Sequence, residues 1–402
     1  MLLIKNKAFR HLFLGRLFNV LADSMMFFSI LKWIELHSNA SGAFTLFYVA
    51  YYLPITLFAI PAGAWLNNKR LQAVMVNSTI IRIAVLLCFL LVMPVIDYHW
   101  AYLLLILLSV LGLIFIPASQ SILPNIVDQD YRPAANSMMQ LGYTAVKVIG
   151  QISTALLLKL TMTPLVLWGV SAILLICSLL FITQIKPSLP TKQESGQSKV
   201  ALIKDGILYI VEHVQLRPLF TLLACALFVA SSVDLLLISF LTKVLLIGVE
   251  NLSFIGAASL LGIAAGASLV PRWYKKVERK YLIIPPLFGL GISVGSLFFV
   301  THWMVILPFF FIQGVALGCF NVTFVTYLQD VVSSENYTRT FSLYNMIASA
   351  MALPGILLVG SLLGSIGVLN TILVTSGILI LIGTFGIYWM PQLGKGDSRV
   401  LS

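Results

Sequence analysis

Long apolar stretches alternate with short polar stretches along almost the whole chain. Each apolar stretch holds about 20 residues, the length that an α-helix needs to cross the ~30 Å hydrocarbon core of a bilayer. The pattern predicts twelve spanning helices, at residues 9–34, 43–66, 73–96, 100–118, 135–159, 164–185, 217–242, 252–271, 282–300, 304–326, 341–364 and 367–390. We therefore expect an all-α membrane protein whose surroundings are a lipid bilayer.

Composition agrees with this pattern. The 402 residues are 59% hydrophobic and 10% charged, whereas soluble domains carry roughly 25% charged residues. The net charge of +11 would suit a nucleic-acid partner. However, the basic residues occupy short loops between apolar segments and form no continuous basic surface, so no nucleic-acid partner is expected.

The loop charges predict the orientation. If the N-terminus is cytoplasmic, nineteen of the 25 basic residues fall in cytoplasmic loops, and Lys32, Lys159 and Lys243 fall on the opposite side. Basic residues concentrate on the cytoplasmic side of membrane proteins. We expect both termini in the cytoplasm and, for a bacterial chain, location in the plasma (inner) membrane.

A polar segment divides the chain near its middle. Residues 186–205 read KPSLPTKQESGQSKVALIKD, a Pro-, Ser- and Lys-rich composition typical of a linker. It separates an N-terminal six-helix bundle, residues 1–185, from a C-terminal six-helix bundle with a short cytoplasmic tail, residues 206–402. Residues 186–205 are expected to form a cytoplasmic linker.

The two halves resemble each other at a constant offset of 205 to 207 residues. The FRHLF sequence from Phe9 matches the LRPLF sequence from Leu216, and Gly150 matches Gly355. Six helices per half give the halves the same orientation, so they are predicted to be parallel repeats about an axis normal to the membrane.

Two acids lie deep inside predicted spans. Asp23 is about 20 Å along the first helix by the helical rise, and Asp234 lies well inside the seventh. A charged side chain at this depth costs about 3 kcal/mol on insertion scales and marks a functional site by default. We interpret both as proton-coupling or substrate-binding residues; the alternative is that one or both are solvated near the external helix end.

Arg82 and Lys147 lie near the middle of the third and fifth spans. Neither reaches the interface easily, so each needs a partner or a water-filled cavity, and Asp23 is the obvious acid. We expect Arg82 and Lys147 either to bind an anionic group of the substrate or to adjust the pKa of Asp23. The alternative is a structural ion pair that holds helices together. Arg16 is only ~10 Å into the first helix and could extend to the interface instead.

Several amides accompany these charges. Asn19, Gln140, Gln151 and Asn345 either line a cavity or make helix-packing hydrogen bonds. Asn19 is four residues from Asp23 and Arg16 is seven, so the three share one face of the first helix. That face is expected to border a central cavity.

Small residues and prolines are expected to shape the helices. Gly262 and Gly266 have the four-residue spacing of a close helix–helix contact. Pro354-Gly355 predicts a kink in the eleventh helix and Pro285-Pro286 a bend in the ninth.

Motifs of catalysis and ligand binding are missing from the sequence. It has no phosphate-binding loop, no nucleophile elbow, no HExxH and no Cys/His cluster. We therefore expect neither an enzyme nor a protein with a cofactor or metal.

The arrangement as a whole resembles the major facilitator superfamily. Twelve helices in a 6+6 parallel repeat, a basic mid-chain linker and a basic loop after the second helix, GAWLNNKR from Gly63 to Arg70, carry the resemblance. Asn67 stands where the family usually has an aspartate. The resemblance implies a monomeric secondary transporter of a small molecule that works by rocker-switch alternating access.

A finer resemblance comes from FRHLFLGR at Phe9–Arg16, PASQSILPNIV at Pro117–Val127 and ANS at Ala135–Ser137. These segments are similar to the macrolide-efflux and siderophore-exporter branch of bacterial drug:proton antiporters. This implies export of an amphipathic, drug- or macrolide-like molecule coupled to proton uptake.

Other functions stay open. With Arg16 set aside, the deep charges balance, which also suits a siderophore or another anionic or zwitterionic metabolite. An importer or a lysophospholipid transporter is a further alternative. A non-transporting sensor or assembly partner would fit the altered loop at Asn67.

Overall fold

The computed structural model describes residues 6–38, 42–65, 69–128, 131–161, 163–185, 216–273, 280–332 and 350–389, residue 277, and single residues or short stretches within 208–213 and 340–348. These residues form helices and turns. Asn345 and the predicted linker, residues 186–205, lie outside the described residues.

The chain groups into two compact units. The first contains residues 1–194 and 247–257, and the second contains residues 195–246 and 258–402. Residues 247–257, at the start of helix α11, thus belong with the first unit although they follow the seventh span in sequence.

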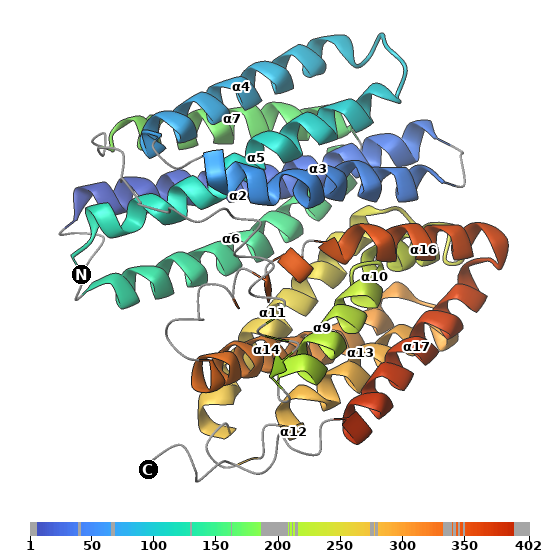
Figure 1. The fold of residues 1–402 in the computed structure, drawn as a ribbon. Coiled ribbons are helices and arrows are strands. Elements are labelled where there is room, and N and C mark those ends of the chain that lie inside the picture. The colour runs from blue at the N-terminus through green and yellow to red at the C-terminus, as the bar shows by residue number, and fades with distance from the viewer. Residues whose placement is uncertain are drawn as a thin grey trace, which may run out of the picture. The chain divides into compact units, whose positions relative to one another are not determined.

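The first unit is built around helix α2. Its helices are α2 (Lys7–His37), α3 (Ala43–Trp65), α4 (Leu71–Val92), α5 (Trp100–Ile126), α6 (Arg132–Thr161) and α7 (Pro164–Thr183). Helix α2 packs along α7 and α6 and touches α3 and α5, while α4 packs on α5 and α7 (Figure 1). The most central helix therefore carries the polar face predicted at Arg16, Asn19 and Asp23.

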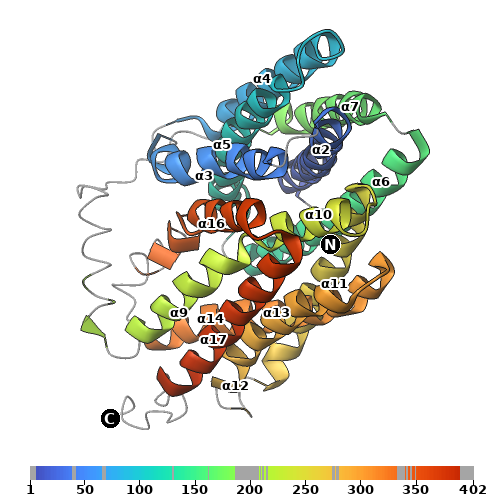
Figure 2. The same ribbon diagram turned by 90° about the vertical axis from the view of Figure 1, so that its right-hand side faces the viewer.

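The second unit is arranged around α13 and α17. Its elements are α9 (Leu216–Ala230), α10 (Val233–Lys243), α11 (Glu250–Trp273), α12 (Lys280–Ile283), α13 (Pro285–Ser296), η2 (Leu297–Phe299), η3 (Trp303–Val305), α14 (Ile306–Val331), α16 (Ala352–Ser365) and α17 (Val368–Trp389). Helix α13 packs against α14 and α17, and α9 packs against α16 and α17 (Figure 2).

The predicted spanning helices are confirmed. Among the described residues, eleven helices are long and apolar enough to cross a membrane, and a shorter apolar helix lies at Ala43–Phe58. Large apolar side chains such as Leu91, Ile173, Leu180 and Phe299 are exposed on the helices. Exposed apolar surface of this extent suits a lipid solvent, and the chain is an integral membrane protein.

The seventh span is broken, although the sequence pattern predicted one continuous helix at 217–242. Helix α9 ends at Ala230 and α10 begins at Val233. The hydroxyls of Ser231 and Ser232 donate to the carbonyls of Phe228 and Val229, at 3.1 Å and 2.7 Å. Such local bonds compete with the helical ladder and bend helices, and apolar periodicity does not report them.

The prolines differ in their effect on the helices that contain them. The ninth span bends at Ile284, directly before Pro285, and the eleventh has a turn at Met351, three residues before Pro354; both lie where a missing proline N–H weakens the helix. In contrast, α5 continues through Pro117 to Ile126, so this span extends beyond the approximate boundary at residue 118 and past Leu123.

The two matched glycines make equivalent contacts. A Cβ atom at Gly150 would lie 3.0 Å from the hydroxyl oxygen of Ser24, and one at Gly355 would lie 2.7 Å from that of Ser231. Ser24 and Ser231 are themselves related by the repeat offset. Ser231 Oγ also donates to the Ala352 carbonyl at 3.2 Å. The first and fifth spans of one half and the seventh and eleventh of the other therefore cross in the same way.

Backbone contact joins α11 to α14. A Cβ atom at Gly262 would lie 2.1 Å from the Phe311 carbonyl oxygen, and one at Gly266 would lie 2.0 Å from that of Val315. On the facing helix, a Cβ atom at Gly314 would lie 2.1 Å from the Ser259 carbonyl oxygen, and one at Gly318 would lie 2.2 Å from that of Ile263. The glycine spacing predicted from the sequence thus meets a second glycine pair on its partner helix.

This contact gives a stability prediction. Gly266→Ala places a methyl group against the Val315 carbonyl, and overpacking of this kind costs about 1–3 kcal/mol. We expect the melting temperature in detergent to fall by several degrees. The matched control is Gly377→Ala on α17, where a Cβ atom meets nothing within 4 Å; it should be neutral or slightly stabilising. Equal melting temperatures for the two variants would contradict the close contact.

Candidate functional site

A buried charge cluster joins α2 to α4. The Arg82 guanidinium donates from Nη1 to Asn19 Oδ1 at 2.9 Å, and from Nη2 to Asp23 Oδ1. Arg82 is 1% exposed, whereas the Asp23 side chain is 38% exposed. Of the two cations that could have paired with Asp23, the structure brings Arg82 to it.

The helices place these groups by simple spacing. Asn19 and Asp23 are one turn apart on α2, so both face the same neighbour. Arg82 follows buried Thr79, Ser78 and Met75 on the inner side of α4. A buried ion pair is tolerated only when further hydrogen bonds satisfy its donors. Here two donors, Arg82 Nε and Asn19 Nδ2, are buried without a partner among the described residues.

A second polar group lies between α2 and α6. Arg16 Cζ lies 5.9 Å from the centroid of the Tyr143 ring, and Lys147 Nζ lies 5.7 Å from the same centroid. Both distances are within the range of a cation–π interaction. Arg16 is half-buried, and its Nε has no hydrogen-bond partner among the described residues. Arg16 therefore points to α6, and its extension to the membrane interface stays a prediction.

Two other predicted site residues, Gln140 and Asp234, join neither the Arg82 cluster nor the contacts around Tyr143. The side chain of Gln140 is exposed on α6. Asp234 is exposed in the first turn of α10, directly after the break at Ser231 and Ser232, where the helix dipole favours an acid. The two deep acids thus differ in setting: Asp23 lies inside a continuous helix and Asp234 at a helix start.

A charged cluster that the sequence pattern did not predict lies at the other end of α2. Lys32 Nζ lies 2.6 Å from Glu35 Oε2 and 2.9 Å from Glu250 Oε2. The Val249 backbone N–H donates to Glu35 Oε1 at 2.9 Å. The Lys32 and Glu35 spacing of three residues is a recognisable helical pair, but no local pattern relates them to Glu250.

Helix α6 also contacts the start of α11. Lys159 Nζ donates to Asn251 Oδ1 at 2.9 Å and lies 5.1 Å from the centroid of the Phe254 ring. A Cβ atom at Gly256 would lie 3.1 Å from the Gln151 amide, so Gln151 packs against α11. These contacts and those of Lys32 explain why residues 247–257 group with the first unit.

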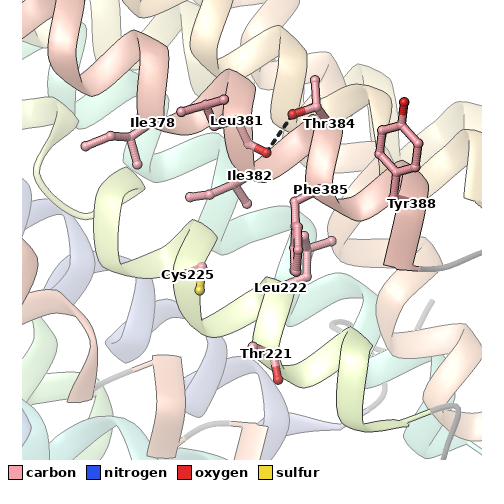
Figure 3. Close-up of a pocket in the computed structure, with 9 residues that line it drawn as sticks. All are labelled: Thr221, Leu222, Cys225, Ile378, Leu381, Ile382, Thr384, Phe385 and Tyr388. Carbon is pink, nitrogen blue, oxygen red and sulfur yellow. Dashed lines mark hydrogen bonds between the residues drawn. The ribbon is translucent and has the colours of Figure 1, made fainter.

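A cavity of about 450 Å³ lies between α9 and α17 in the second unit (Figure 3). It is lined by Thr221, Leu222, Cys225, Ile378, Leu381, Ile382, Thr384, Phe385 and Tyr388. No charged side chain lines it, and Leu381, Phe385 and Tyr388 are exposed on the outer surface. An apolar recess of this kind suits lipid chains better than a coupling site.

Taken together, the described residues of the first unit place protonatable and cationic groups at membrane depth. Tyr143 was not predicted; its spacing of four residues from Lys147 on α6 was the available signal. Ionisable groups at this depth typically mark the path of a proton or a charged solute.

Comparisons with known proteins identify the family of this chain. The sequence profile of the Major Facilitator Superfamily matches residues 12–355 and 219–401. The uncharacterized MFS-type transporter YvqJ of Bacillus subtilis (strain 168) is 24% identical over 416 residues, 99% of this chain and 96% of the relative.

Solved transporters share the fold at low identity. The nucleoside transporter NupG superposes with a TM-score of 0.75 at 12% identity, over 96% of this chain and 99% of NupG. A POT family transporter in complex with 5-aminolevulinic acid gives 0.76 at 12%, over 97% of both chains. A bacterial homologue of the human lysosomal transporter Spinster gives 0.75 at 14%, over 96% and 97%. The chain belongs to the Major Facilitator Superfamily and is a membrane transporter, not an enzyme.

Proposed function

We propose that the protein is a proton-coupled secondary transporter that exports an amphipathic small molecule by alternating access between residues 1–185 and 206–402. The observation that supports this is the buried cluster of Arg82, Asn19 and Asp23. A buried cation, an amide and a half-exposed acid form a site whose charge changes when one proton binds.

Asp23 is the proton carrier in this proposal. Its side chain is partly exposed while that of Arg82 is buried, so a proton reaches the carboxylate without passing the guanidinium. Protonation of a carboxylate oxygen neutralises Asp23 and leaves the Arg82 charge without a counter-ion. Because an unpaired buried charge is strongly unfavourable, the two protonation states prefer different arrangements of α2 and α4. A proton can shift a conformational equilibrium only through such a difference.

The proposed direction of transport, the membrane and the orientation in it are inferred from the sequence. Similarity to drug:proton antiporters supports export by antiport, and the loop charges support a bacterial inner membrane with both termini in the cytoplasm. A monomer is sufficient for this mechanism.

A second candidate is transport of an anionic or zwitterionic metabolite, inward or outward. The observation that favours it is that Asp23 already holds Arg82, while Arg16 and Lys147 both face Tyr143. A cationic drug would find its acid occupied in this unit.

The first test is proton flux in liposomes that contain the purified protein, followed with an internal pH dye. A panel of macrolides, cationic dyes and organic anions is added outside. We expect at least one compound to start a proton movement, and Asp23→Asn to reduce that movement at least about tenfold, because the amide cannot carry the proton.

The matched control is Asp97→Asn. Asp97 is an exposed acid between α4 and α5 that pairs with His99, so the same chemical change there should leave the flux intact. Full coupling in Asp23→Asn would refute the role of Asp23. No proton movement with any compound, from folded protein, would favour the sensor or assembly function. Proton movement in the same direction as the compound would replace antiport with symport.

A second prediction concerns the energetics of the pair. Asp23→Ala leaves a buried guanidinium unpaired, a change that typically costs about 3 kcal/mol or more. Arg82→Gln should also destabilise, but the double variant should lose about 1–3 kcal/mol less than the sum of the single changes. Melting temperatures of the four proteins in detergent measure this coupling. The exposed pair of Asp97 and His99 is the control, and its coupling should be much weaker because solvent screens exposed charges. Additive losses at Asp23 and Arg82 would show that the pair is not energetically joined.

A further inference from the structure

The deep charges of the first unit do not balance. Arg16, Arg82 and Lys147 are three cations at membrane depth, whereas Asp23 is the acid found at comparable depth among the described residues of α2, α4 and α6. Asp23 is hydrogen-bonded to Arg82. Two cations, Arg16 and Lys147, are therefore left with no acidic partner in the described part of the unit.

An aromatic ring partly takes the place of that partner. Arg16 approaches the Tyr143 ring to 5.9 Å and Lys147 approaches it to 5.7 Å. A cation–π contact stabilises a charge by much less than a carboxylate does, about 0.5–2 kcal/mol. Moreover, two cations on one ring repel each other, and the unpartnered Arg16 Nε is an unused donor.

This arrangement is favourable for an incoming anion. A carboxylate or phosphate group between the two cations would accept hydrogen bonds from both and remove their mutual repulsion. Charged hydrogen bonds of this type are the strong ones, and the guanidinium is suited to planar, bidentate recognition. The Tyr143 ring would at the same time contact an apolar or aromatic part of the same molecule.

We propose that Arg16, Tyr143 and Lys147 form an anion seat, which binds the carboxylate or phosphate group of an amphipathic organic anion as the transported substrate. This inference rests on the proposed function and narrows its substrate class. The seat is separate from the proton site, because Arg16 precedes Asp23 by seven residues, about 10 Å along α2. One group of residues binds the proton and another binds the substrate.

The test is direct binding to the purified full-length protein in lipid nanodiscs. Carboxyfluorescein and rhodamine 123 are the probes, because both carry the xanthene ring system but have opposite charge. Fluorescence anisotropy reports binding of each dye, and a set of aromatic carboxylates serves as competitors. We expect the protein to bind the anionic dye, or at least one of the carboxylates, more tightly than rhodamine 123.

Variants then assign the binding to the seat. Lys147→Gln and Arg16→Gln should each weaken anion binding by about tenfold or more, while Lys147→Arg should keep it within about threefold. The control is Arg217→Gln, which removes an exposed cation at the start of α9 and should leave binding unchanged. If the two cations only held α2 to α6, Lys147→Gln would lower the melting temperature without altering the ratio of anion to cation binding.

The outcomes separate this inference from the proposed function. Preferred binding of rhodamine 123, absence of binding by every anion, or an unchanged ratio in Lys147→Gln would overturn the anion seat. Proton flux that responds to a cationic dye and is lost in Asp23→Asn would in that case still support proton-coupled transport. Anion binding with no proton flux would support the seat and refute the coupling.

Discussion

The cost of an unpaired charge in a medium without water governs the polar structure of this protein. Helices satisfy their own backbone groups in lipid, so the side-chain charges are what must find partners. Arg82 is the clearest case, because it is almost fully buried and meets both Asn19 and Asp23. The long Arg82 side chain reaches from α4 to α2 and brings these groups together, and the proposed proton step uses the same requirement.

Much of the fold could be predicted because the bilayer sets helix length. The spans follow from apolar runs, and the repeat of Gly150 and Gly355 reappears as equivalent contacts with Ser24 and Ser231. The break between α9 and α10 could not be predicted in this way. It depends on hydroxyl groups that bond to their own helix, and hydropathy treats such serines as mildly polar residues within a span.

The sequence predicted which residues belong to the candidate site, but it did not predict which of them contact one another. Depth along a helix identified Asp23, Arg82 and Lys147, because charge is rare there. Which cation meets the acid depends on the rotation and tilt of α4 and α6, to which the sequence pattern is nearly indifferent. Tyr143 and Glu250 were missed for a related reason: an aromatic ring within an apolar helix and an acid at a helix start are both ordinary until their neighbours are known.

Helix α11 is held by two kinds of contact. Near Gly262 and Gly266 it touches the backbone of α14, and this contact depends only on shape. Its first turn is held by Lys32 and Lys159 through Glu250 and Asn251, contacts that depend on charge. A change of charge at Glu250 would alter the second kind and leave the first unchanged. One end of this helix therefore responds to electrostatics, whereas the other end responds to steric fit.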